Sequence, residues 1–277
     1  MRPVTPCSVH MNGYRNTVAV RAARALRAAR TTPAPVTRTL IVLCCAVFVI
    51  GPAGGLNPAY GTGDALLAAQ QTYFRRWGVI PADLFTGSAR AALTPATALF
   101  VHGSWVHLLG NMLFLHVFGA MTEERMGRTR FTLFYAGCGY LALVGYAVAH
   151  AGSDQSLVGA SGAISAVLGA FLYLFPRARV TSVLPFLFFL PLRLPAWVVL
   201  PFWAALQWLA AGRAAQGPGV AYLAHVVGFG LGFLFAWARF GGHGRRRRGS
   251  GGAAVGAGRT TRVKASPAPA PEGENQP

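Results

Sequence analysis

Residues 159–175 read GASGAISAVLGAFLYLF, a serine among small residues at the head of an apolar run. An apolar run of about this length, as a helix, nearly spans the hydrocarbon core of a bilayer, which predicts a membrane span at about 157–175. Another apolar run contains His225, within Ala224–Gly228. A nucleophile and a base that both lie in membrane-length segments indicate chemistry inside a membrane.

The composition of the whole chain agrees with that class. The 277 residues are 53% hydrophobic and only 12% charged, with a mean hydropathy of +0.43, whereas a soluble domain carries about a quarter charged residues. The net charge of +18 is typical of nucleic-acid binding,. The arginines, however, gather in the two tails and in particular loops, as orientation in a membrane requires. We therefore predict an all-α polytopic membrane protein without a nucleic-acid partner or a cleavable signal peptide.

Six apolar segments are predicted to span the membrane as a helical bundle. They lie at about 38–56, 97–121, 131–150, 157–175, 195–211 and 219–240,. Segment 57–94 is expected to be partly helical and interfacial, and the proline-broken segment 180–192 to be re-entrant or interfacial. The membrane domain is thus 38–240, between a basic tail at 1–37 and an Arg/Gly/Pro-rich tail at 241–277.

Arginine placement predicts the orientation of these spans. If the N-terminus is cytoplasmic, the outside segments hold Arg75, Arg76, Arg90 and Arg213. The inside segments hold both basic tails and Arg125, Arg128, Arg130, Arg177, Arg179 and Arg193,. Both tails then lie on one side, as an even number of spans requires. We expect a multi-pass protein of a bacterial plasma membrane with both termini cytoplasmic. The repeat from Arg21 to Arg30, with a spacing of three, fits either an amphipathic helix on an anionic membrane surface or a disordered anchor.

Five side chains in the predicted spans are candidates for chemistry. Ser161 needs a base to become a nucleophile, and His225 suits that role near neutral pH. His107 and Asn111 are four residues apart, share one helical face, and can donate to a developing oxyanion, as can the Ser161 amide. His102 lies five residues before His107, about 140° around a helix, which suggests support of a loop or of a neighbouring side chain.

Small residues explain how the serine and histidine helices come close. Gly162, Ala166 and Gly169 form a strip on the fourth span, and Gly228 and Gly232 follow the histidine by three and seven residues on one face,. Each feature also has a structural interpretation, because a serine, a histidine or Asn111 can simply link helices. The four cysteines fit neither a zinc site nor a disulfide framework, and no metal or cofactor is expected.

From about Leu93 to Phe240 the chain resembles the rhomboid family of intramembrane serine proteases. The resemblance rests on four stretches: the His-His-Asn pattern of His102–Met112, the loop Glu123–Gly127, the motif Gly159–Gly162, and Ala224–Gly228 followed by Gly232.

The resemblance implies a Ser161–His225 dyad without an aspartate and an oxyanion hole from His107, Asn111 and the Ser161 amide. It implies supporting roles for His102 and for the glycines Gly159, Gly162, Gly228 and Gly232. It also implies a six-helix bundle with a water-filled cavity that opens outward and a fifth helix that gates entry. The substrates would be transmembrane segments of membrane proteins in the lipid bilayer, cleaved near the outer face after a small residue.

Three features depart from the family pattern. Leu93-Thr94 stand where many members carry Trp-Arg, and His116 stands where an apolar or aromatic residue is expected. Ser165 stands where some members place an aromatic residue that packs on the base, so His225 needs another support.

Two other functions remain open. One is a catalytically inactive relative that binds membrane proteins and directs their traffic or degradation. The other is a redox or transport protein that uses His102, His107, His116 and His225 as haem ligands or as a proton relay.

Overall fold

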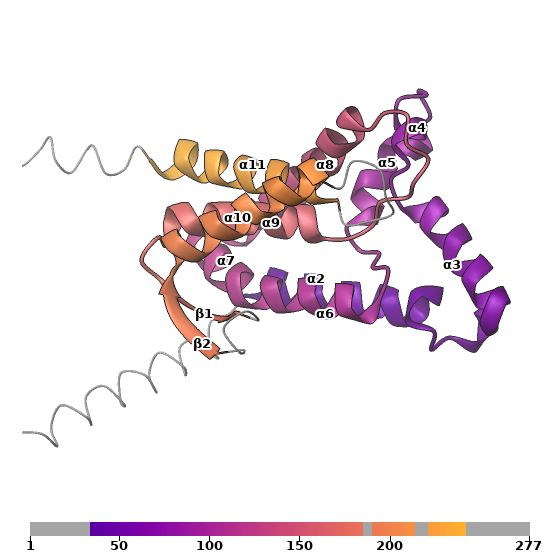
Figure 1. The fold of residues 1–277 in the computed structure, drawn as a ribbon, viewed down its shortest axis with the longest axis horizontal. Helices are drawn as coiled ribbons and strands as arrows, with labels where there is room; N and C mark the ends of the chain where they lie inside the picture. The colour runs from indigo at the N-terminus through magenta and orange to yellow at the C-terminus, as the bar shows by residue number, and fades with distance from the viewer. Residues whose placement is uncertain (1–33, 185–189, 214–220, 242–277) are drawn as a thin grey trace, which may run out of the picture. The chain divides into compact units, whose positions relative to one another are not determined.

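The computed structural model describes residues 34–184, 190–213 and 221–241, and these form helices almost throughout (Figure 1). The elements in chain order are α2 (Pro35–Ile50), η1 (Pro52–Gly54), η2 (Pro58–Tyr60), α3 (Gly63–Trp77), α4 (Pro81–Leu84), α5 (Ala89–Ala98), α6 (Trp105–Phe114), η3 (Leu115–Gly119), α7 (Ala120–Met126), α8 (Arg128–Ala149), α9 (Ser161–Leu174), β1 (Arg179–Leu184), β2 (Leu190–Pro195), α10 (Ala196–Arg213) and α11 (Tyr222–Phe240). The predicted tails, including the arginine repeat at 21–30, lie almost wholly outside the described residues.

Among the described residues, three helices are long and apolar enough to cross a bilayer. They are Trp105–Met126, which joins α6, η3 and α7, then Arg128–Ala149 and Tyr222–Phe240. Three shorter apolar helices, Pro35–Ile50, Ser161–Leu174 and Ala196–Gly212, coincide with the other predicted spans. The chain is therefore a helical membrane protein, and the count of six spans stays a prediction.

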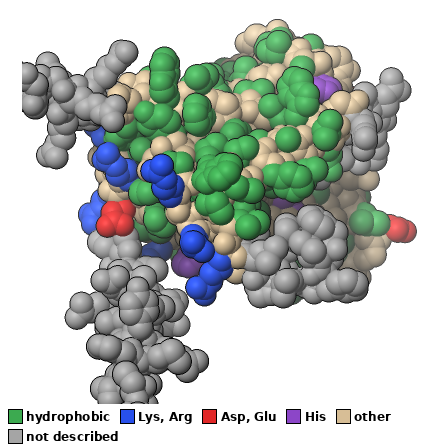
Figure 2. Space-filling model, turned by 60° about the vertical axis from the view of Figure 1, so that its left-hand side comes forward, with side chains coloured by type: hydrophobic (Ala, Val, Ile, Leu, Met, Phe, Trp, Pro, Cys, Tyr) green, Lys and Arg blue, Asp and Glu red, His purple; other side chains and the backbone are tan. Residues whose placement is uncertain are grey.

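The outward faces of these helices carry large apolar side chains. Val106, Leu133 and Ile50 are 83%, 69% and 66% exposed. Figure 2 shows apolar side chains over most of one face of the molecule, with arginines gathered toward one side of it. An apolar surface of this extent is unfavourable in water, whereas it suits a helix whose outward face contacts the hydrocarbon core of a bilayer.

Helix α9 lies at the centre of the packing. Every residue from Gly162 to Phe171 is buried. On one side Gly139 of α8 meets it, and a Cβ there would lie 2.7 Å from the Cβ of Ala163. On the other side Gly232 of α11 meets it, and a Cβ there would overlap the Ala166 carbonyl. Small residues on both faces allow this close approach.

A buried carboxylate fixes the start of α2. Glu123, on α7, is 1% exposed. Its oxygens accept hydrogen bonds from the backbone N–H of Val36 at 3.0 Å and of Thr37 at 2.7 Å, and from Thr37 Oγ1 at 2.8 Å. A negative charge at a helix N-terminus satisfies free N–H groups and complements the helix dipole. These hydrogen bonds therefore hold the start of α2 against α7. Helix α7 is the end of the Trp105–Met126 helix that lies away from Trp105.

The predicted second span, at 97–121, is divided in the structure. Helix α5 ends at Ala98, and α6 begins only at Trp105. The Ser104 side chain caps α6 by accepting from the His107 N–H at 3.2 Å, which is the usual role of serine at an N-cap. The helical part of the prediction for 57–94 is confirmed by α3 and α4 and by most of α5.

The prediction of an all-α fold misses one hairpin. Strands β1 and β2 pair antiparallel, from Arg179 opposite Pro195 to Leu184 opposite Leu190. Val180, Thr181 and Val183 are β-branched and favour a strand,. Helix α10 follows β2 directly, and the Ala196 N–H donates to the Ala178 carbonyl at 2.8 Å.

Candidate active site

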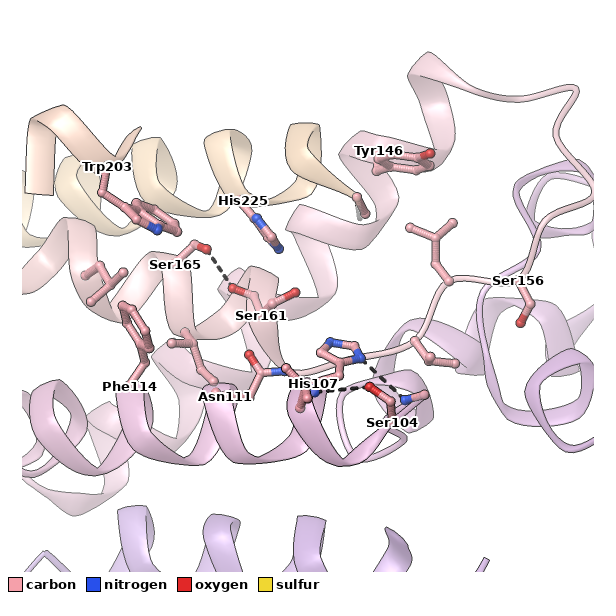
Figure 3. A pocket seen from close by; sticks show the side chains of 18 of the residues that line it. Ser104, His107, Asn111, Phe114, Tyr146, Ser156, Ser161, Ser165, Trp203 and His225 are labelled. Atoms are coloured by element: carbon pink, nitrogen blue, oxygen red, sulfur yellow. Dashed lines mark hydrogen bonds between the residues drawn. The ribbon is translucent and has the colours of Figure 1, made fainter. Parts of the chain in front are cut away.

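One cavity of about 640 Å³ lies between α6, α9, α10 and α11 (Figure 3). Four predicted site residues line it: Ser161, His225, His107 and Asn111. The loop before α9 closes part of the wall with Gln155–Val158. In Figure 3 the imidazole of His225 projects from α11 toward Ser161, which begins α9.

The backbone before Ser161 places this residue at the cavity wall. Gly159 has a φ of 128°, a conformation that side chains other than hydrogen rarely allow,. Its N–H donates to the Ala98 carbonyl at 2.9 Å, which ties the loop to the end of α5. Ala160 supplies no side-chain cap, so the first N–H groups of α9 keep their donor capacity near Ser161,.

His107 lies close to this turn in a defined tautomer. A Cβ on Gly159 would lie 2.8 Å from both Cε1 and Nε2 of His107 and 3.7 Å from Ser161 Oγ. The Gly103 N–H donates to His107 Nδ1 at 3.4 Å, so Nδ1 acts as an acceptor. In a neutral imidazole the other nitrogen, Nε2, then carries the proton. His107 therefore presents an N–H donor beside Ser161.

Asn111 lies one turn further along α6. It is 8% exposed, and its Nδ2 has no hydrogen-bond partner among the described residues. A buried amide N–H without a partner is costly, and such groups cluster where a ligand completes them. Asn111 thus offers a second donor to the cavity.

His225 is 7% exposed, and its two ring nitrogens have different surroundings. Nδ1 lies 2.8 Å from Oε1 of Gln207, on α10. An amide oxygen only accepts, so Nδ1 carries the proton and Nε2 carries the lone pair. Nε2 is buried and has no partner in the described part of the chain. This is the protonation state that a general base needs.

Two aromatic side chains also hold the imidazole. Trp203 of α10 stacks on it with ring centroids 6.1 Å apart and an interplanar angle of 26°. Tyr222, one turn before His225 on α11, meets it edge-on at 6.3 Å. Trp203 and Gln207 were not predicted from the sequence as partners of His225. Two features could have pointed to them: Ser165 stands in place of an aromatic residue, and Gln207 is a lone glutamine in an apolar run.

The predicted glycines pack the two helices that carry the serine and the histidine. A Cβ on Gly228 would overlap the Gly162 carbonyl, and a Cβ on Gly232 would overlap that of Ala166. A Cβ on Gly169 would overlap the Phe229 carbonyl in the same way. Glycine on both sides therefore lets α9 and α11 touch through their backbones.

His102 and His116 do not line the cavity. His102 precedes α6, so the predicted angle of 140° along a helix does not apply to it. It is 1% exposed, its ring meets that of His107 edge-on at 5.2 Å, and Nδ1 lies 3.3 Å from the Phe100 carbonyl oxygen. His116 is exposed on η3. The described residues contain no group of three or more His, Cys, Asp or Glu arranged to hold a metal ion.

The family of the chain follows from comparison with known sequences. The sequence model of the rhomboid domain matches residues 90–242, which is more than half of the chain and contains all the cavity residues named above. The chain belongs to the rhomboid family. This is a family of membrane proteins, typically serine proteases, that act on membrane-protein substrates within the bilayer.

Two curated relatives match parts of the chain. "Rhomboid protein 1, mitochondrial" of Saccharomyces cerevisiae is 37% identical over 152 residues, 50% of this chain and 39% of that protein. "Putative rhomboid protease YdcA" of Bacillus subtilis is 36% identical over 78 residues, 28% of this chain and 39% of that protein. The chain thus spans about two fifths of either relative. One relative is named mitochondrial and the other is bacterial, so the expected bacterial plasma membrane gains no support from them.

Proposed function

We propose that this chain is an intramembrane serine endopeptidase that cleaves transmembrane segments near the outer face of the membrane. One observation carries the proposal: Ser161 and His225 line one cavity, whose wall also holds two side chains that can donate. Those donors are His107 and Asn111. Nucleophile, base and oxyanion donors at one cavity form the minimum set for acyl transfer.

The proposed reaction has two stages. Ser161 Oγ attacks the scissile carbonyl carbon while His225 Nε2 takes the hydroxyl proton. His107 Nε2–H, the Asn111 amide and the Ser161 N–H hold the oxyanion. When the C–N bond breaks, His225 returns the proton to the leaving amine. Water then gives a proton to His225 and attacks the acyl carbon. When the bond between that carbon and Ser161 Oγ breaks, His225 returns the proton to Oγ, and the free serine and neutral imidazole are restored.

The arginine distribution extends the proposal to orientation. With six spans and both termini cytoplasmic, the cavity lies toward the outer leaflet, where a partly unwound substrate helix exposes its backbone. The narrow space between Gly159 and His107 favours a small residue before the scissile bond. A membrane protein with a single span and small residues at its outer end is the simplest substrate of this kind.

A serine-reactive fluorophosphonate probe tests the nucleophile on the full chain in liposomes. We expect labelling of the wild type and none of Ser161→Ala or His225→Ala. Ser165→Ala is the matched control, because Ser165 lies one turn along the same wall and its hydroxyl already donates to the Ser161 carbonyl at 2.6 Å. Labelling of this control should persist.

Cleavage of a reporter with one transmembrane segment gives the second readout. Product from the wild type and none from Ser161→Ala is the expected result. Equal product from both would remove Ser161 from the mechanism. A wild type that neither cleaves nor takes up the probe would instead support the inactive, membrane-protein-binding alternative.

A further inference from the structure

The base of the proposed dyad is held by a third polar side chain, Gln207. Its Oε1 lies 2.8 Å from Nδ1 of His225. Gln207 is the only amide, hydroxyl or charged side chain between Ala196 and Ala211. A polar side chain in an apolar helix is costly in lipid unless it is bonded, and His225 supplies its bond.

The chemical identity of the partner atom decides what the bond does. The amide oxygen has lone pairs and no proton, so it accepts from Nδ1–H and excludes the tautomer that has its proton on Nε2. Only the retained tautomer can take a proton from Ser161. When His225 becomes an imidazolium, the same bond strengthens because its donor is then charged.

The geometry also restrains the direction of the ring. The Nδ1 bond to Gln207 holds one side of the imidazole, and Trp203 stacks on its face at an angle of 26°. Both side chains come from α10, one turn apart. Position 165, on α9, carries only a serine whose hydroxyl donates to the Ser161 carbonyl, so it offers the ring no aromatic face.

We propose that Gln207 is the positioning residue of the catalytic base, so that the working unit is Ser161–His225–Gln207. The proposal rests on the proposed function and deepens it. Gln207 does not line the cavity, and it acts by holding His225 in one tautomer and one orientation. Because Gln207 lies on α10 and His225 lies on α11, the bond depends on how these two helices are placed.

The test compares Gln207→Leu and Gln207→Glu in the full chain in liposomes, with the rate of fluorophosphonate labelling measured from pH 5 to 9. Gln207→Leu keeps the size and loses the acceptor, so we expect labelling to slow by about tenfold, the effect of one hydrogen bond to a group that becomes charged. Gln207→Glu keeps an acceptor and adds a negative charge that stabilises the imidazolium. In the plot of labelling rate against pH, the acidic limb is the fall in rate that protonation of His225 causes. For Gln207→Glu this limb should therefore move to higher pH.

The remaining titratable groups near the imidazole stay the same in these variants. They are His107 and Tyr146 at the cavity and Tyr222 beside the ring. A shift of the acidic limb is thus assigned to position 207, and a merely structural role would not produce it. Leu206→Ala is the control on the same helix, because Leu206 is 45% exposed.

The outcomes separate this inference from the proposed function. If Ser161→Ala abolishes labelling while Gln207→Leu labels within twofold of the wild type and Gln207→Glu keeps the wild-type limb, Gln207 has no positioning role. If Ser161→Ala labels like the wild type, the protease assignment itself fails. Slow labelling of Gln207→Leu, a shifted limb in Gln207→Glu and normal labelling of Leu206→Ala support the inference.

Discussion

The contact between α9 and α11 and the contact between α10 and His225 are built in opposite ways. Between α9 and α11, glycines bring the two backbones together, as at Gly162 and Gly228. At α10, two long side chains, Trp203 and Gln207, reach across to the imidazole. The first contact consists of backbone packing, and the second consists of one hydrogen bond and one stacked ring.

Helices α9 and α10 also differ in how far their side chains are buried. Residues 162–171 of α9 are all buried. Helix α10 instead exposes Phe202, Trp208 and Leu209, and it contains Pro201, which removes one helical hydrogen bond,. Ser161 and His225 thus lie on two helices joined by backbone packing, whereas the hydrogen bond to His225 Nδ1 comes from a third helix, α10, through one side chain.

Replacing Gly232 should disturb the molecule most, because this residue lies in the close contact between α9 and α11. Gly232→Val places a branched side chain against the Ala166 carbonyl, so the helices must separate, at a cost of more than about 3 kcal/mol,. We expect loss of both folding and labelling, measured by thermal unfolding in detergent. Gly230→Ala is the matched control on α11, because its Cβ would meet nothing within 4 Å. Unfolding at the wild-type temperature by Gly232→Val would contradict the close contact.

The second effect separates chemistry from folding. Asn111→Ala removes a buried donor that has no partner in the described residues, so folding should be unharmed. Loss of one oxyanion donor lowers turnover by about 10²–10³-fold. Reporter cleavage and thermal unfolding measured on the same sample check both parts. Leu109→Ala is the control, since Leu109 is 60% exposed on α6. Near-normal turnover would exclude Asn111 from the oxyanion hole.

The side chains gathered at the cavity, and the small-residue contact, could be predicted from the sequence. Both follow from local spacing: His107 and Asn111 share a face at four residues apart, and Gly228 and Gly232 follow His225 at three and seven,. The structure brings the four candidates to one cavity. Their catalytic roles stay a prediction that the probe experiments test.

The features that the sequence did not predict are contacts between distant segments and one break in a helix. Glu123 and Thr37 are separated by 86 residues, and no local pattern pairs them. The break before Trp105, which leaves His102 outside α6, depends on a serine cap that apolar periodicity does not reveal,. The bond from Gln207 to His225 depends on how α10 is rotated about its axis. Apolar residues on every face of this helix leave that rotation undetermined,.

The third prediction concerns Glu123 on α7, which does not line the cavity. Glu123→Gln leaves one oxygen to accept where two accept now, and turns an N–H toward the N–H groups of α2,. We expect a loss of about 1–3 kcal/mol in the free energy of unfolding, with labelling retained at low temperature. Glu124→Gln, one residue away and exposed, is the control. Equal stability of both variants would show that the bond contributes nothing.

A milder change is expected at Trp203, the aromatic residue of α10 that stacks on His225. Trp203→Leu removes the ring stacked on His225 and leaves Gln207 in place, so the tautomer is kept while the orientation loosens. An aromatic contact of this kind contributes about 0.5–1.5 kcal/mol, which slows probe labelling by about twofold to tenfold without moving the acidic limb,. Trp208→Leu is the matched control, because Trp208 is 61% exposed on the same helix. If both tryptophan variants slowed labelling equally, the effect would belong to the packing of α10 as a whole. A slowing confined to Trp203→Leu, with an unmoved limb, would separate the orientation of the base from its protonation, which Gln207 alone should control.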